Sequence, residues 1–265
     1  MPIRAILFDL DDTLIVDEAV SRETIAVVAA LAFSTLGADE ATFQRSVVKH
    51  AHRLAEPAPV RPFCKRIGIS PYECLWGEFV GVTDDFQALH DWAHQFRRDV
   101  FDAALRDQQL ESDDVTEQLA TRFEAERRKL IRLMPDAREV LTRLALDYRI
   151  GLLTNGAPDL QREKIAASGL VNFFNAIVIS GEHNVGKPKP EIFQRLLADL
   201  SVTPEEAVMV GNSMERDIAG ARNAGVRNVW IKVSGAEEHA DVQPDHTITG
   251  LAELPDLLAK MSEES

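Results

Sequence analysis

The pattern of apolar and polar positions divides the chain into two kinds of segment. Residues 3–10 form a short apolar run that ends in carboxylates, which indicates a buried strand. After residue 134, amphipathic segments alternate with short apolar runs, which lie at 148–153, 176–180, 206–210, 228–233 and 246–249. Alternation of this kind is typical of a parallel sheet that helices cover on both faces.

Residues 17–133 have the spacing of helices and contain no convincing strand. Asp39 and the acidic pair Asp84-Asp85 are expected to begin helices, and the segment 70–73 (SPYE) combines a capping residue, a proline and a glutamate at the spacing of a helix start. The simplest arrangement is a doubly wound α/β core, residues 1–16 plus 134–265, with an all-helical cap domain, residues 17–133, inserted after the first strand.

Polar side chains occur where the strands of the expected core end. In an open parallel sheet, ligands bind beyond the carboxyl ends of the strands, so residues there are candidates for chemistry. The candidates are Asp9 and Asp11 after the first strand, Thr154 and Asn155 after the second, Lys187 after the third, and Asn212 and Asp217 after the fourth.

Asp9 and Asp11 are two residues apart, a spacing that points both side chains to the same side of an extended segment. Two such carboxylates repel each other unless a cation or a proton lies between them. One can then act as a nucleophile and the other as an acid and base. The alternative is a solvated turn, because aspartate is common at turns.

The charge of the chain limits its partners. The formal net charge is −14, and a surface so acidic repels the phosphate backbone of nucleic acids, so we expect no nucleic acid polymer as a partner. A small phosphorylated substrate is also repelled at long range. Any site for it must therefore gather positive charge locally, from a lysine, a metal ion or backbone N–H groups.

The two cysteines, Cys64 and Cys74, have neither zinc nor redox spacing and are expected to be reduced thiols. The first apolar run is far shorter than the ~20 residues that span a bilayer, and no secretory signal pattern opens the chain. We therefore expect a cytoplasmic protein without a membrane partner. The oligomeric state stays open.

Four segments resemble, in order, the motifs of the haloacid dehalogenase superfamily. The matching segments are residues 8–14 (FDLDDTL), 153–156 (LTNG), 186–193 (GKPKPEIF) and 210–217 (VGNSMERD). The resemblance covers the expected core, and the helical block takes the place of the family's cap. Dehalogenases of this superfamily lack the second aspartate of the first motif, whereas this chain has Asp11, which favours phosphoryl transfer.

The resemblance implies a role for each matching residue. Asp9 would attack phosphorus and form an aspartyl-phosphate, while Asp11 would protonate the leaving oxygen and later take a proton from water. Thr154 would bind the phosphoryl oxygens through its hydroxyl, with Asn155 assisting through its backbone N–H. Lys187 would neutralise developing charge and hold Asp9 ionised, and the neighbouring Lys189 is expected to be a surface charge.

The family also implies a Mg²⁺ cofactor. Its expected ligands are Asp9, the backbone carbonyl of Asp11, Asn212 and Asp217, because this ion prefers hard oxygen donors. Asn212 departs from the family, which usually has aspartate there. An amide oxygen brings no charge, so Asp217 would have to supply the missing carboxylate. Asn212 is alternatively a helix cap.

The expected activity is Mg²⁺-dependent hydrolysis of a small phosphorylated metabolite. A phosphomutase of the same superfamily and a non-catalytic binding module that keeps the fold are the alternatives. His90 and His94 lie four residues apart on an expected helix, a spacing that can bind metal, but the sequence shows no third ligand, and a polar helix face is the interpretation we prefer.

Overall fold

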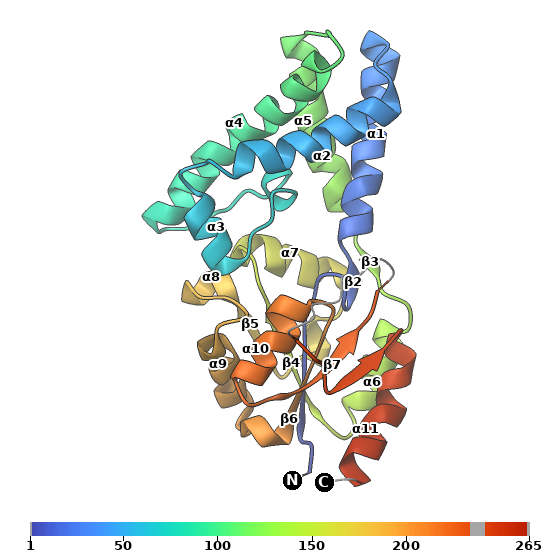
Figure 1. Cartoon of the computed structure of the whole chain (residues 1–265), viewed down its shortest axis with the longest axis vertical. Helices are drawn as coiled ribbons and strands as arrows, with labels where there is room; N and C mark the ends of the chain where they lie inside the picture. The colour runs from blue at the N-terminus through green and yellow to red at the C-terminus, as the bar shows by residue number, and fades with distance from the viewer. Residues whose placement is uncertain (1, 234–241, 264–265) are drawn as a thin grey trace. The chain divides into compact units, whose positions relative to one another are not determined.

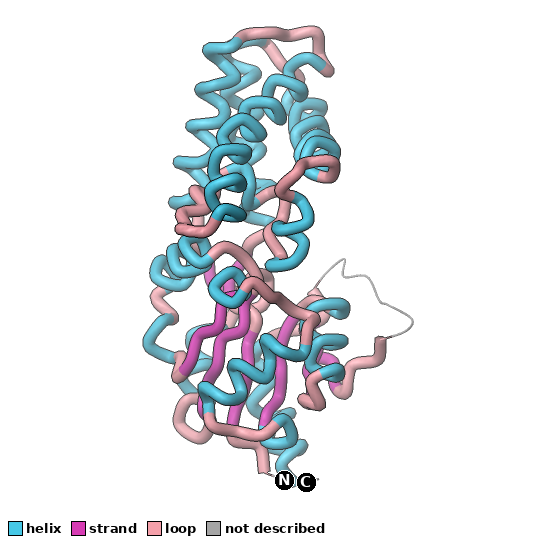
Figure 2. Tube along the Cα trace, turned by 90° about the vertical axis from the view of Figure 1, so that its left-hand side faces the viewer, coloured by secondary structure: helices cyan, strands magenta, loops and turns pink. Residues whose placement is uncertain are grey.

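The computed structural model, which describes residues 2–233 and 242–263, places six strands in one parallel sheet of order β5-β4-β1-β6-β7-β8 (Figure 1, Figure 2). The strands are β1 (Ala5–Phe8), β4 (Arg149–Thr154), β5 (Ala176–Ile179), β6 (Ala207–Gly211), β7 (Arg227–Ile231) and β8 (His246–Ile248). The predicted α/β fold with a parallel sheet is confirmed. β1, the first strand of the chain, lies in the middle of the sheet.

Helices cover both faces of this sheet, as the alternation predicts. They are α6 (Ala137–Leu144), α7 (Pro158–Ser168), α8 (Ser180–His183), α9 (Pro190–Leu200), α10 (Ala219–Asn223) and α11 (Leu254–Glu263). In β1, Ile6 and Phe8 belong to the apolar core with α6 and α11, whereas Ala5 and Leu7 belong to the core with α9 and α10. Because successive side chains of a strand face opposite ways, a fully buried strand is apolar throughout.

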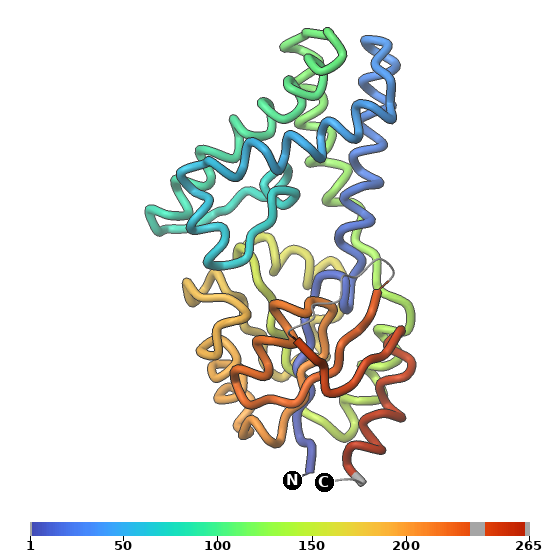
Figure 3. The backbone as a smooth tube through the Cα atoms, in the orientation of Figure 1, coloured from blue at the N-terminus to red at the C-terminus, as the bar shows by residue number. Residues whose placement is uncertain are grey.

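A short two-stranded sheet marks the point where the chain leaves the core and returns to it (Figure 3). β2 (Ile15–Val16) pairs antiparallel with β3 (Arg132–Leu133), two strands that the sequence analysis did not predict. The described chain forms two compact units, within 1–16 plus 132–265 and within 17–131. The boundary therefore lies two residues before the predicted one, since Arg132 and Leu133 pair with β2.

The second unit, residues 17–131, is built from helices joined by loops, and its described residues include no strand. Its helices are α1 (Glu18–Leu36), α2 (Glu40–Ala55), α3 (Arg61–Ile67), α4 (Asp84–Arg106) and α5 (Asp113–Lys129), with a single 3₁₀ turn η1 (Glu73–Leu75). Ser70 and Glu73 form the expected reciprocal cap, but only this one turn follows it. Cys64 and Cys74 are buried and free.

Among the described helices, α1 is long and apolar enough to cross a membrane by length and composition alone. The sequence analysis did not consider it for that role. Its buried residues include Ile25, Val28 and Ala32, and the helix packs against α2 and α5 of the same unit. A core helix of a helical bundle meets the same length and composition criteria, so the predicted lack of a membrane partner stays a prediction.

Candidate active site

The site begins where β1 ends. The backbone N–H of Asp9 donates to the carbonyl of Val210 at 3.0 Å, which continues the pairing of β1 with β6 by one residue. The carboxylate of Asp9 is therefore carried by the central strand of the sheet, and the residue is 8% exposed. Rigid elements hold a reacting group more accurately than loops do, so this position suits a nucleophile.

Lys187 contacts carboxylates from two separate segments of the core. Its Nζ lies 2.5 Å from Oδ1 of Asp9 and 2.7 Å from Oδ1 of Asp217. All three side chains are buried. Three of the residues singled out by the sequence thus meet through one ammonium group, although they are far apart in the chain. Lys189, by contrast, is exposed, as expected for a surface charge.

Burial and charge act in opposite directions on this group of side chains. Burial disfavours the charged form of Lys187, but the attraction of Asp217 and Asp9 outweighs it and raises the pKa of the ammonium above its usual value. Burial also raises the pKa of Asp217 to about 6, although Lys187 opposes this rise. The lysine is therefore cationic at neutral pH, and most Asp217 carboxyl groups are ionised there.

Asn155 holds the backbone of Lys187. Its Oδ1 accepts from the Lys187 N–H at 2.9 Å, and its Nδ2 donates to the Lys187 carbonyl at 3.0 Å. A Cβ atom on Gly186 would come within 2.8 Å of this Oδ1, so the preceding position suits glycine. The sequence analysis placed Asn155 beside the phosphoryl group. That role was assigned to its backbone N–H, so the two side-chain contacts are compatible with it and the role stays a prediction.

Asp11 contacts two residues that the sequence analysis missed. Its Oδ1 lies 3.0 Å from Nζ of Lys164, and its Oδ2 accepts from Nε2 of Gln161 at 3.0 Å. The same Nε2 lies 2.5 Å from Oγ1 of Thr154. Lys164 and Gln161 are fully buried on α7, one turn apart. In the sequence, the signal for both residues is that they are polar at positions on the buried face of an amphipathic helix.

Oxygen atoms suited to Mg²⁺ gather around Thr13. The hydroxyl of Thr13 lies 3.2 Å from Oδ2 of Asp9 and 3.4 Å from Oδ1 of Asn212. A carboxylate and an amide oxygen are hard donors, as Mg²⁺ prefers. The residues present therefore fit this ion, with the side chain of Asn212 on the same side as Asp9. Capping of the following turn falls to Ser213, whose side chain accepts from the N–H of Arg216 at 3.2 Å.

Both carboxylate oxygens of Asp217 already have partners. Oδ1 faces Lys187, and Oδ2 accepts from the backbone N–H of Ser213 at 2.9 Å. Each carboxylate oxygen keeps a further lone pair, so metal ligation by Asp217 is compatible with these contacts and stays a prediction. The arrangement favours a role for Asp217 in holding Lys187 and the turn after β6. Asn212 is the other candidate for direct ligation from this segment.

Comparisons with known proteins identify the family of the chain. A model of haloacid dehalogenase-like hydrolases matches residues 3–225. The chain is 38% identical over 252 residues to a phosphoserine phosphatase of Thermus thermophilus, covering 95% of this chain and 97% of the relative. It is 30% identical over 261 residues to the N-acylneuraminate-9-phosphatase of Rattus norvegicus, covering 97% and 94%.

A solved structure shares the fold over the whole length. The magnesium-bound HAD hydrolase YfnB of Bacillus subtilis superposes with a TM-score of 0.66 at 20% identity, covering 97% of this chain and 99% of that one. The family model spans most of the chain, and the fold and motif order agree with it. The chain belongs to the haloacid dehalogenase-like hydrolases.

Proposed function

We propose that this protein is a Mg²⁺-dependent phosphatase that hydrolyses a small phosphomonoester through an aspartyl-phosphate on Asp9. The observation that carries the proposal is the buried Asp9 carboxylate at the end of β1, 2.5 Å from the ammonium of Lys187. The phosphatase activities of the two named relatives support the reaction class. Phosphoserine and N-acylneuraminate 9-phosphate are therefore the first substrates to try.

In the first step, a carboxylate oxygen of Asp9 forms a bond to phosphorus while the bond from phosphorus to the ester oxygen breaks. The leaving oxygen takes a proton from Asp11. Lys187 offsets the negative charge of the phosphoryl oxygens, and the hydroxyl of Thr154 donates to them. Fixed donors and charges of this kind stabilise a transition state without having to reorganise.

In the second step, Asp11 accepts a proton from a water molecule, which attacks the phosphorus of the aspartyl-phosphate. The bond to Asp9 breaks, phosphate leaves, and the starting carboxylate is restored. An acid and base that acts in both steps contributes roughly 10²–10⁴ to the rate. Lys164 and Gln161 are positioning residues here, because they contact Asp11 and hold its carboxylate in place.

Asp9, the backbone carbonyl of Asp11 and Asn212 are the groups that we propose to hold Mg²⁺. When bound, the ion neutralises phosphoryl charge and orients the phosphoryl group. Asp217 acts beside it through Lys187. We assign selection of the substrate's organic part to the helical unit, residues 17–131, because the core residues described above engage only the phosphoryl group.

A phosphomutase and a non-catalytic binding module remain the alternatives. A phosphomutase retains its phosphorylated intermediate and yields an isomer, so phosphate release without isomerised product excludes it. The argument for a binding module was that Asn212 occupies a position where the family usually has aspartate. Its amide oxygen still offers a ligand beside Asp9, which favours the enzyme.

The test is phosphate release from a panel that contains phosphoserine, N-acylneuraminate 9-phosphate, sugar phosphates, nucleotides and phosphoglycolate. We expect turnover of at least one compound with Mg²⁺, little turnover with a chelator, and none with Asp9→Asn. If the folded wild-type protein turns over no compound, the binding module takes the place of the phosphatase. Activity of Asp9→Asn close to that of wild type would remove Asp9 as the nucleophile.

A further inference from the structure

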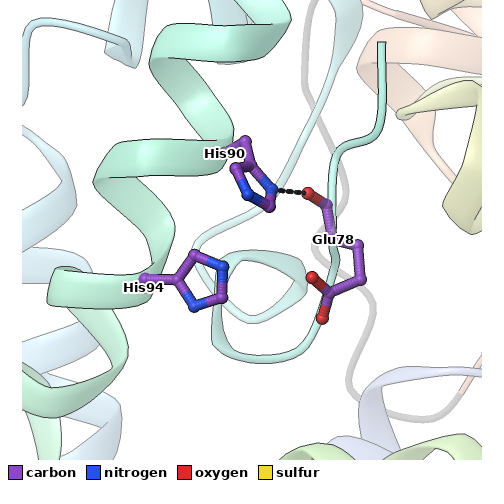
Figure 4. A group of neighbouring side chains, drawn as sticks. All are labelled: Glu78, His90 and His94. Atoms are coloured by element: carbon purple, nitrogen blue, oxygen red, sulfur yellow. Dashed lines mark hydrogen bonds between the residues drawn. The ribbon is translucent and has the colours of Figure 1, made fainter.

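A second group of metal-ligating side chains lies in the helical unit. Glu78, His90 and His94 each offer one ligand atom, and these atoms all lie within 4.8 Å of one another (Figure 4). The two histidines are one turn apart on α4, and Glu78 lies in the segment before that helix. The sequence analysis found the histidine pair but no third ligand. The fold supplies it.

The hydrogen bonding of His90 prepares its ring for metal. Its Nδ1 lies 2.7 Å from the backbone carbonyl of Glu78, and since a carbonyl only accepts, Nδ1 carries the hydrogen (Figure 4). The lone pair is then on Nε2. A histidine that binds metal through one ring nitrogen usually donates from the other to a carbonyl or carboxylate. The ring of His94 lies next to it, with centroids 4.8 Å apart at 84°.

The carboxylate of Glu78 is ionised and held in place. Its Oε1 lies 3.4 Å from Arg128 and 3.7 Å from Arg97, and both arginines also contact Glu124. Burial works against the charge, but a hydrogen bond from Glu124 and the two arginines lower the pKa of Glu78. That hydrogen bond requires Glu124 to carry a proton, and burial raises the pKa of Glu124. Glu78 therefore carries the negative charge of this pair of carboxyl groups.

The group is accessible from solvent. His94 is exposed, while Glu78 and His90 are partly buried. A hollow of about 330 Å³ adjoins His90, lined also by Phe79, Val80, Gly81, Gln87 and Asp91. Because His94 is exposed, an ion can approach the group from solvent, and water molecules can complete its coordination.

We propose that Glu78, His90 and His94 form a Zn²⁺ site in the helical unit, separate from the Mg²⁺ site proposed in the core. Two imidazole nitrogens and a carboxylate suit zinc, whereas Mg²⁺ prefers oxygen ligands alone. Ligand atoms around tetrahedral zinc are about 3.3 Å apart, so small side-chain rotations bring the three into range. The bound ion ties the segment around Glu78 to α4.

The experiment is a titration of the full chain with Zn²⁺ against a chromophoric chelator, in excess Mg²⁺ and with Asp9→Asn as the parent protein. The excess Mg²⁺ and the Asp9 substitution keep zinc out of the core site, so this result does not depend on the proposed phosphatase activity. Into this parent we introduce Glu78→Gln, His90→Ala and His94→Ala one at a time. His52→Ala removes an exposed histidine of α2 in the same unit and serves as the matched control.

We expect the parent and His52→Ala to bind one Zn²⁺ per chain, and thermal unfolding of both to move to higher temperature with zinc. His94→Ala and His90→Ala should bind zinc at least roughly 10-fold more weakly and lose the thermal shift. If His90→Ala does not fold, His94→Ala decides, because its side chain is exposed. A parent that binds no zinc, or His94→Ala with unchanged affinity, overturns the proposal.

Discussion

At the scale of single residues, the site depends on one ammonium group that two carboxylates share. Lys187 is 5% exposed and contacts both Asp9 and Asp217. An ion pair of this kind adds little stability by itself, because desolvation opposes the attraction. Removal of one partner is costly, however, since it leaves a buried charge unpaired, at roughly 3–5 kcal/mol.

The substitution Lys187→Met should reduce kcat/KM by roughly 10²–10³, because one fixed positive charge no longer faces the phosphoryl oxygens. It should also destabilise the protein at neutral pH, since Asp9 and Asp217 are left without their shared partner. The exposed Lys189 provides the matched control, and Lys189→Met should keep wild-type activity. If Lys189→Met loses activity and Lys187→Met keeps it, the assignment of the lysine is wrong.

Lys164 is expected to act through Asp11. Its buried ammonium lies 3.0 Å from the Asp11 carboxylate and favours the ionised form. In Lys164→Met, protonation of this carboxylate becomes easier, so the alkaline limb of the pH–rate profile should move to higher pH while kcat falls. Lys189→Met again removes one lysine without touching the site. A purely structural role would lower activity equally at every pH, and that result would contradict this account.

Asp217 links the site to the pH dependence of stability. Its pKa is about 6 in the folded protein, above the ordinary value of ~3.9 in an unfolded chain. The folded state therefore binds more protons between these two values, so the contribution of this residue to stability is present at low pH and is lost as the pH rises through about 6.

Asp217→Asn keeps the shape of the side chain and removes its titration. The free energy of unfolding is measured by denaturant titration in the presence of a chelator. Because all other groups titrate alike in the two proteins, it should fall less steeply between pH 4 and 6 in the variant than in wild type. Turnover should be lost, because Lys187 no longer has its second partner. Identical pH dependence in both proteins would show that the Asp217 pKa is not raised.

At the scale of elements, the last residue of β6 must lie close to Asp217. A Cβ atom on Gly211 would meet Oδ2, Cγ and Cβ of Asp217 at 2.3, 2.4 and 2.6 Å. Gly211→Ala should therefore displace Asp217 and raise the Mg²⁺ concentration needed for half-maximal activity. Gly250→Ala is the matched control, because its added Cβ meets no atom within 4 Å. An unchanged Mg²⁺ titration in Gly211→Ala would show that the turn tolerates the shift.

The predictability of the elements follows from their length. The strands and helices of the core show a clear periodicity of apolar residues in the sequence. Asp9, Thr154 and Lys187 were therefore singled out because they lie at or after the ends of predicted strands. β2 and β3 were missed because a two-residue strand has no period to detect. The cap at Ser70 formed as predicted, yet only one 3₁₀ turn follows it.

Residue contacts were less predictable than positions. The roles of Lys164 and Gln161 depend on which face of α7 contacts the end of β1. The spacing of residues in the sequence does not predict that contact. The third ligand beside His90 and His94 was hidden for the same reason, because Glu78 reaches them only when the segment before α4 folds back. Sequence motifs therefore indicated candidate residues, while the structure showed which side chains contact them.

At the scale of the whole molecule, the net charge of −14 repels the proposed anionic substrate. This repulsion and the attraction by lysines within the site act over different distances. Surface charges are screened beyond about 8 Å at physiological ionic strength. The ammonium groups of Lys164 and Lys187 are buried, where screening is weak. Local positive charge can therefore govern binding of a phosphoryl group once it arrives.

The central claim is that Asp9 itself receives the phosphoryl group. The most direct test is rapid acid quenching of the wild-type protein during turnover of p-nitrophenyl phosphate with Mg²⁺, followed by mass spectrometry of its peptides. We predict one phosphoryl group on Asp9, lost on treatment with hydroxylamine and absent from Asp9→Asn. Turnover with the phosphoryl group on another residue, or with no phosphorylated peptide and an active Asp9→Asn, would contradict the account.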